Sequence, residues 1–177
     1  MSLIKQIYRK VLHMKDKKYR TITNFLIITL NILMAVGVIA GIGIIVSAVI
    51  SGVPKVNSSN FTLNCVIFFI GTASLIYILY NLKKILKSVL SNGPFTMNNV
   101  KCLNKISICC FIITICYLIN FIFNNLFTKF SFIEIDKTGI HTDTEFLIFF
   151  FAGLFVVILA QVYKQAVEVK EENDFTI

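Results

Sequence analysis

The side chains that most often carry out proton transfer, ion transport or metal binding are absent from the longest apolar stretches of this 177-residue chain. These stretches contain no Asp, Glu, Lys, Arg or His, and they are residues 25–50, 63–82, 106–127 and 146–163. Pumps and transporters place such residues inside their membrane segments, where the high cost of a charge marks an ion or proton path. The stretches therefore carry no sign of an ion or proton path.

Histidines and cysteines are the remaining candidates for metal binding or nucleophilic catalysis. His13 precedes the first stretch and His141 precedes the last, so we expect them on opposite sides of a membrane. Cys109, Cys110 and Cys116 have no neighbouring base or cation, which an activated nucleophile requires. We expect these cysteines to pack as small side chains. The sequence therefore predicts no catalytic residue, no metal site, no cofactor and no enzyme activity.

Some polar side chains do lie within the apolar stretches, and we single out Asn31, Thr114, Asn120, Asn124 and Gln161. Asn120 and Asn124 share one helix face because they are four residues apart. Hydrogen bonds between helices are the usual role of such groups, worth ~0.6 to 2 kcal/mol each. A polar binding cavity built from the same groups is the alternative.

The elements that position these residues are membrane helices. Each apolar stretch is close to or longer than the ~20 residues that a helix needs to cross a hydrocarbon core. A composition of 56% hydrophobic and 15% charged residues leaves too little polar surface for a soluble domain of this size. We expect an all-α integral membrane four-helix bundle with a basic arm (residues 1–24), a membrane domain (residues 25–165) and an acidic tail (residues 166–177).

The basic residues predict the orientation of the four spans. All of the 17 lysines and arginines except Lys55, Lys129 and Lys137 precede span one, lie between spans two and three, or follow span four. Cytoplasmic loops retain Lys and Arg, so we expect both termini in the cytoplasm. The net charge of +8 then reflects orientation in the lipid bilayer and not direct binding of nucleic acid.

The basic arm has the pattern of an amphipathic helix. Leu3, Ile4, Ile7, Val11 and Met14 recur at helical spacing, with most of the arm's basic residues between them. This pattern is typical of a helix that lies on the inner membrane surface and is attracted to anionic lipid. An arm that only sets orientation is the alternative.

Span one contains two pairs of small residues, Gly37 with Gly41 and Gly43 with Ser47. Small side chains at this spacing let helix backbones approach closely in lipid. We expect span one to be a packing centre within the chain, and dimerisation is the alternative.

Residues 91–100, called the elbow here, connect spans two and three. The Gly93-Pro94 pair predicts the end of one helix, and Thr96 is placed to cap a new helix that begins at Met97. Spans two and three are therefore expected to form a helical hairpin that protrudes into the cytoplasm.

Residues 129–144, between spans three and four, contain near-alternating apolar and polar side chains. A turn at residues 136–139 ends in Gly139. This pattern predicts a β-hairpin, which we expect to form a small cap over the bundle.

The acidic tail continues span four as a helix, in which Lys164 and Glu168 are spaced for an i,i+4 ion pair. The carboxylates that follow could pair with lysines near the elbow, while Phe95 and Phe175 pack at the membrane edge. Exposed ion pairs contribute only ~0 to 1 kcal/mol each, so a solvated tail is the alternative.

Two segments together resemble a known family. They are Asn92-Gly93-Pro94-Phe95-Thr96-Met97-Asn98-Asn99-Val100 and Glu168-Val169-Lys170-Glu171-Glu172-Asn173-Asp174-Phe175-Thr176-Ile177. They are similar to the bacterial membrane family called domain of unknown function 2975, whose members have four spans, a Gly-Pro-Phe-Thr turn and a terminal Glu-Asn-Asp-hydrophobic-Thr-aliphatic signature. The departure is at the exit of span four, where Lys164, Gln165 and Ala166 replace a glycine-containing stretch.

The resemblance implies a multi-pass protein of the bacterial cell membrane with no assigned reaction. Members are often encoded beside a small helix-turn-helix regulator, which implies a DNA-binding protein as a cytoplasmic partner, in signalling or sequestration. The candidate partner-binding residues are those that match the family: Gly93, Pro94, Phe95, Thr96, Asn99, Glu171, Glu172, Asn173, Asp174 and Thr176. A small transport or immunity protein of the cell membrane is the alternative.

Overall fold

Four long helices make up almost all of the computed structural model, which describes residues 2–50, 58–91, 93–125, 134–136, 139–141 and 145–174. The elements in chain order are α1 (Ser2–Ile50), α2 (Ser58–Ser91), α3 (Met97–Asn125), β1 (Glu134–Asp136), β2 (Gly139–His141) and α4 (Glu145–Asp174). Each helix contains a segment long and apolar enough to cross a membrane. The prediction of an all-α, multi-pass four-helix membrane bundle is confirmed.

The helices continue beyond the apolar stretches at one end of the molecule. α1 has 49 residues and is therefore roughly 73 Å long at 1.5 Å per residue, more than twice the ~30 Å of a hydrocarbon core. α1 joins the arm to span one without a break, so an arm lying in the membrane plane would require a bend that α1 does not have. The location of the arm at the membrane surface stays a prediction.

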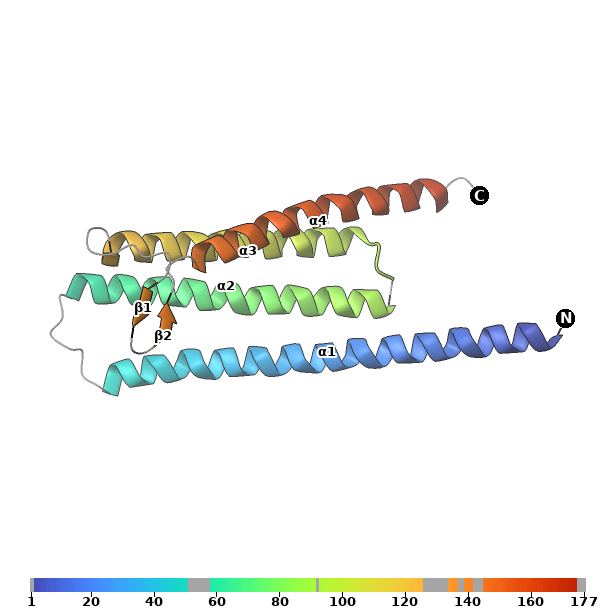
Figure 1. Cartoon of the computed structure of the whole chain (residues 1–177), viewed down its shortest axis with the longest axis horizontal. Helices are drawn as coiled ribbons and strands as arrows, with labels where there is room; N and C mark the ends of the chain where they lie inside the picture. Colours follow the sequence, from blue (N-terminus) through green and yellow to red (C-terminus); the bar gives the residue numbers. More distant parts are fainter. Residues whose placement is uncertain are drawn as a thin grey trace.

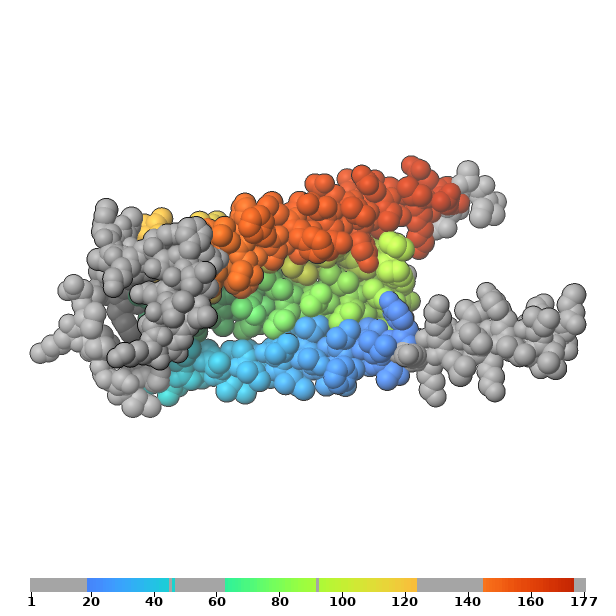
Figure 2. Space-filling model, in the orientation of Figure 1, coloured from blue at the N-terminus to red at the C-terminus, as the bar shows by residue number. Residues whose placement is uncertain are grey.

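The helices pack in chain order. Among the described residues, α1 contacts only α2, α2 contacts α1 and α3, and α3 contacts α2 and α4. The start of α1, the elbow and the end of α4 lie at the same end of the molecule (Figure 1). Figure 2 shows the blue part of α1 beside the green part of α2. An even number of membrane crossings brings the start of α1, the elbow and the end of α4 to the same end.

α3 is the central helix of the bundle. In its most apolar part 39% of residues are buried, against 6% in α1 and in α2 and 11% in α4. Cys102, Ile106, Cys109, Ile113 and Cys116 recur at alternating intervals of four and three residues and are each at most 8% exposed. This is the spacing of the packing seam in a left-handed helical bundle. Cys109 and Cys116 are therefore packing residues within that seam, and Cys110 is also buried.

α4 approaches α3 closely at Gly153. A Cβ atom added there would lie 3.1 Å from Cε1 of Phe111 and 3.3 Å from Cβ of Cys110. Ala160 and Val167 follow at intervals of seven residues and are 2% and 1% exposed. Small side chains allow this approach, and close packing holds helices together in lipid.

α1 approaches α2 at Gly37 and Gly41. A Cβ atom at Gly37 would lie 3.8 Å from Cγ1 of Ile76, and one at Gly41 would lie 3.9 Å from Cγ2 of Thr72. Gly43 is exposed, and a Cβ there would have no neighbour within 4 Å. The first pair of small residues therefore packs within the chain, the second pair's Gly43 does not, and the side chain of Ser47 lies outside the description.

β1 and β2 form an antiparallel hairpin between α3 and α4. Glu134 pairs with His141, and Asp136 pairs with Gly139. The predicted hairpin is confirmed, whereas residues 137 and 138 of its predicted turn lie outside the described residues. Its position as a cap over the bundle stays a prediction.

We predict that Gly153→Ala destabilises the protein by about 1–3 kcal/mol, because the added methyl group overpacks the contact with Phe111 and Cys110. The measurement is chemical unfolding of the detergent-solubilised protein, followed by circular dichroism. Gly43→Ala is the control, since its methyl group has no neighbour within 4 Å. Equal unfolding midpoints for the two variants would contradict a tight contact between α3 and α4 at Gly153.

Candidate functional site

The elbow is a defined turn. α2 ends at Ser91, and Gly93 adopts φ 85°, a left-handed conformation that glycine accepts without a steric cost. α3 then begins at Met97, and the backbone N–H of Asn99 donates to the Oγ1 of Thr96 at 3.4 Å and to its carbonyl oxygen at 3.0 Å. The predicted helix end and the Thr96 cap are both confirmed.

Asn99 fixes the inner side of the elbow. Its side chain is fully buried, and Nδ2 donates to the carbonyl oxygen of Pro94 at 2.7 Å. The Oδ1 of Asn99 is also buried and has no hydrogen-bond partner among the described residues. A buried acceptor without a partner lowers the stability of the folded protein by ~1–3 kcal/mol. The Nδ2 of Asn99 therefore stabilises the elbow, whereas its Oδ1 destabilises it.

The elbow is also joined to the end of α2. The hydroxyl oxygens of Ser88 and Thr96 lie 3.4 Å apart, and Ser88 is only 9% exposed. Thr96 thus contacts α2 through the same hydroxyl group that caps α3. These contacts hold the helical hairpin closed at its tip.

α4 packs beside the elbow through an aromatic pair. The rings of Phe95 and Tyr163 are 5.5 Å apart with their planes inclined by 38°. Such pairs contribute ~0.5–1.5 kcal/mol beyond the area that they bury. Phe175, which we expect at the membrane edge together with Phe95, lies outside the described residues, and the described partner of Phe95 is Tyr163.

The acidic end of α4 is exposed. Lys164 and Glu168 form the predicted i,i+4 ion pair, with Nζ and Oε1 3.6 Å apart. Their side chains are 57% and 48% exposed, so the pair contributes little to stability. The other matching tail residues are Glu171, Glu172 and Asn173, which are exposed, Asp174, where α4 ends, and Thr176, which lies outside the described residues.

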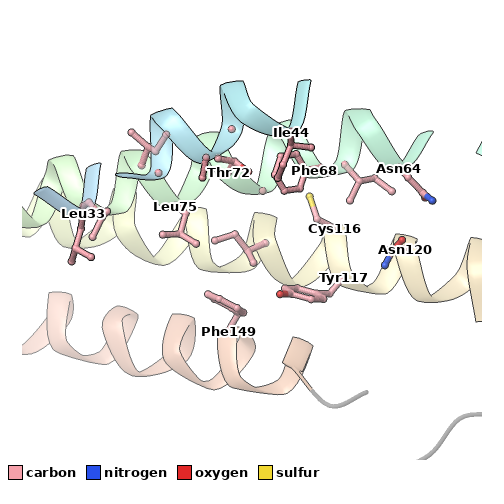
Figure 3. Close-up of a pocket in the computed structure, with 18 residues that line it drawn as sticks. Leu33, Ile44, Asn64, Phe68, Thr72, Leu75, Cys116, Tyr117, Asn120 and Phe149 are labelled. Carbon is pink, nitrogen blue, oxygen red and sulfur yellow. The ribbon is translucent and has the colours of Figure 1, made fainter. Parts of the chain in front are cut away.

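A groove with a volume of about 620 Å³ lies in the membrane part of the bundle, between α1 and the other helices. α2 provides most of its floor, and α3 and α4 contribute Cys116, Tyr117 and Phe149 on the side away from α1 (Figure 3). Asn64 and Asn120 lie at one end, and Leu33 lies toward the other (Figure 3).

The polar residues expected to join the spans have different roles. Thr114 donates to the carbonyl oxygen of Cys110 at 3.0 Å, within its own helix, and a bond between Thr114 and another helix stays a prediction. Asn120 lines the groove, whereas Asn31 and Gln161 are exposed and do not line it. The side chain of Asn124 lies outside the description.

Some residues of the site were missed by sequence reasoning. Ser88 and Tyr163 hold the elbow, and Gly71 and Asn64 line the groove. Ser88 lies eight residues before Thr96, and two residues this far apart can face each other across the tip of a helical hairpin. No local signal distinguishes Tyr163 from the other tyrosines near span ends.

We predict that Asn99→Asp destabilises the protein by about 1–3 kcal/mol, because a buried carboxylate would replace the Nδ2 donor beside the carbonyl oxygen of Pro94. Thermal unfolding in detergent is the measurement. Asn98→Asp is the matched control, since Asn98 is exposed and its carboxylate would gain the same favourable interaction with the start of α3. A similar unfolding temperature for both variants would contradict a structural role of Asn99.

Comparison with protein families gives one match, "Protein of unknown function (DUF2975)", which covers residues 47–177. The matched region contains α2, α3, α4 and the elbow. Neither the curated proteins nor the solved structures contain a match to the chain. Because the match spans well over half of the sequence and includes both segments that resemble the family, the chain belongs to the DUF2975 family of proteins of unknown function.

Proposed function

We propose that the protein is a membrane-anchored docking protein, and not an enzyme, whose elbow and α4 end bind a cytoplasmic protein partner. The observation that supports this proposal is the construction of the elbow. Thr96, Asn99 and Phe95 tie the turn to α2, α3 and α4, while Phe95 itself remains 42% exposed. A rigid turn that presents an exposed aromatic ring is typical of a binding surface.

Asn99 provides a second argument for binding at the elbow. Its unpartnered Oδ1 costs stability, so packing alone does not account for an asparagine at this position. The same turn residues occur in the segment that resembles the family. A role in presenting the elbow to a partner explains why a costly buried group lies there.

The charge of the α4 end supports a basic partner. Glu168, Glu171 and Glu172 are exposed beside the elbow end of the molecule. Helix-turn-helix regulators bind DNA through basic surfaces, and an acidic helix end is complementary to such a surface. The small regulator that the family resemblance implies is therefore the proposed partner, held at the membrane in signalling or sequestration.

The proposal requires that the elbow faces the cytoplasm. The excess of Lys and Arg on the elbow side supports a cytoplasmic location for the elbow and both termini. Lys84, Lys87, Lys101 and Lys105 flank the elbow on exposed positions of α2 and α3. The proposed location is the bacterial cell membrane.

We predict that a cysteine introduced as Ser91→Cys in a cysteine-free variant reacts with a membrane-impermeant maleimide only after cells are permeabilised. Ser91 is exposed at the end of α2, so access depends only on the side of the membrane. Lys55→Cys is the control and is expected to react in intact cells, because it lies in the segment between spans one and two. Labelling of position 91 in intact cells would refute the cytoplasmic elbow.

We predict that the tagged full-length protein, solubilised in mild detergent, co-purifies with the helix-turn-helix regulator encoded beside its gene. Glu171→Gln combined with Glu172→Gln should reduce the recovered regulator at least about tenfold, since two charge pairs at a desolvated interface are worth about 1.4 kcal/mol or more. Glu134→Gln combined with Asp136→Asn is the matched control, because it removes two carboxylates from β1, in the segment between spans three and four. Equal recovery with both variants would argue against docking at the α4 end.

The groove favours the second candidate, a small transport or immunity protein. A space of about 620 Å³ within the spans is large enough for a small hydrophobic compound. Binding in that groove is the step that such a role would require. It would not involve the elbow.

A further inference from the structure

We propose that the groove between α1 and the rest of the bundle binds a single-chain amphiphile with an uncharged, hydrogen-bonding head group, such as a monoacylglycerol. The groove has about 620 Å³ of space and is lined by residues of all four helices. The inference does not depend on docking of a protein at the elbow, because the groove residues lie within the apolar stretches and the elbow lies outside them.

The groove exists because α1 is attached to the bundle on one side only. Among the described residues α1 contacts α2 but neither α3 nor α4. Gly37 and Gly41 hold α1 against α2, and Gly71 leaves space on the groove floor, since a Cβ there would meet no atom within 4 Å. The side of the groove between α1 and the α3–α4 pair is therefore accessible from the surrounding lipid.

The lining changes from polar to apolar along the groove. Asn64 and Asn120 lie at one end, near Tyr117, whose ring stacks on Phe149 with centroids 5.8 Å apart (Figure 3). Leu33, with Leu75, lies toward the other end (Figure 3). An elongated ligand with a polar head and an apolar chain matches this order of side chains.

The polar end specifies the chemistry of the head group. An asparagine side chain has two donors and an acceptor with two lone pairs, so an amide that already makes one hydrogen bond within the protein keeps further donor and acceptor capacity for a ligand. None of the described residues that line the groove is charged. A carboxylate or ammonium head would therefore lack a counter-charge, whereas hydroxyl and ester groups can bond to the amides.

The volume specifies the number of chains. One water molecule occupies roughly 30 Å³ in the liquid, so about 620 Å³ accommodates on the order of 20 heavy atoms. That number corresponds to one long alkyl chain with a small head. A phospholipid with two chains has more heavy atoms than this, so only part of it could lie in the groove.

The test uses the full-length protein in phospholipid nanodiscs and a monoacylglycerol that carries a diazirine in its chain. Photolysis followed by peptide mass spectrometry should place the adducts on α2 and α3 beside the groove. An excess of unlabelled monoacylglycerol should displace the probe from the groove and abolish the labelling. Labelling that does not saturate, or a cross-linked dimer in its place, would overturn the proposal.

Two glycine variants separate groove binding from ordinary contact with lipid. Gly71→Phe should lower the labelling at least about tenfold, because the ring would occupy the groove, and Gly43→Phe should leave it unchanged. A Cβ at either position has open space, and Gly43 is exposed and does not line the groove. Circular dichroism checks that both variants remain helical, and equal labelling of two folded variants would overturn the proposal.

Two further arms test the head group. Asn64→Leu combined with Asn120→Leu should weaken labelling by at least about fivefold, the equivalent of one net hydrogen bond of ~1 kcal/mol. A diazirine fatty acid of the same chain length should label less than the monoacylglycerol at pH 8, where it is ionised. Equal labelling by the two probes would show that the polar end does not select the head group and would overturn the assignment of the ligand class.

Discussion

Close approach of helix backbones through small side chains is the interaction on which the rest of this structure depends. Lipid chains are as apolar as the side chains, so moving a side chain from lipid into a helix contact gains little free energy. Association of the helices therefore relies on tight packing. α3 provides that packing with a seam of cysteine and isoleucine side chains, and α4 meets it at Gly153. α2, α3 and α4 consequently form the consolidated part of the bundle.

The weaker attachment of α1 follows from the same rule. Gly37 and Gly41 bring α1 to ordinary contact distance from α2, but no small residue brings it to α3 or α4 among the described residues. One side of α1 therefore remains separated from the bundle, and the groove occupies the space between them. The asymmetry of packing is the physical origin of the site.

The elbow belongs to the consolidated part. Thr96 bonds to Ser88 of α2 and caps α3, and Phe95 packs against Tyr163 of α4. These contacts connect the three helices at the end where the chain termini also lie (Figure 1). A partner that binds there would contact a surface whose shape is already set before binding, which reduces the entropic cost of association.

Local interactions could be predicted from the sequence, because their signals lie within a few residues of one another. Hydropathy indicated the four spans, Gly93 and Thr96 indicated the turn and cap, and the spacing of Lys164 and Glu168 indicated their ion pair. The pairing of β1 with β2 was likewise indicated by residues close together in the sequence. The family signature was readable for the same reason, since both of its segments are continuous.

Contacts between helices were decided only by the tertiary structure. Gly43 and Gly153 are both glycines within apolar stretches, yet one is exposed and the other permits a close approach of α4 to α3. Tyr163 as the partner of Phe95, and the groove beside α1, likewise depend on the rotation of each helix about its axis. Apolar spans surrounded by lipid have weak amphipathic patterns, so their residue types determine that a helix crosses the membrane but not which of its faces meets a neighbour.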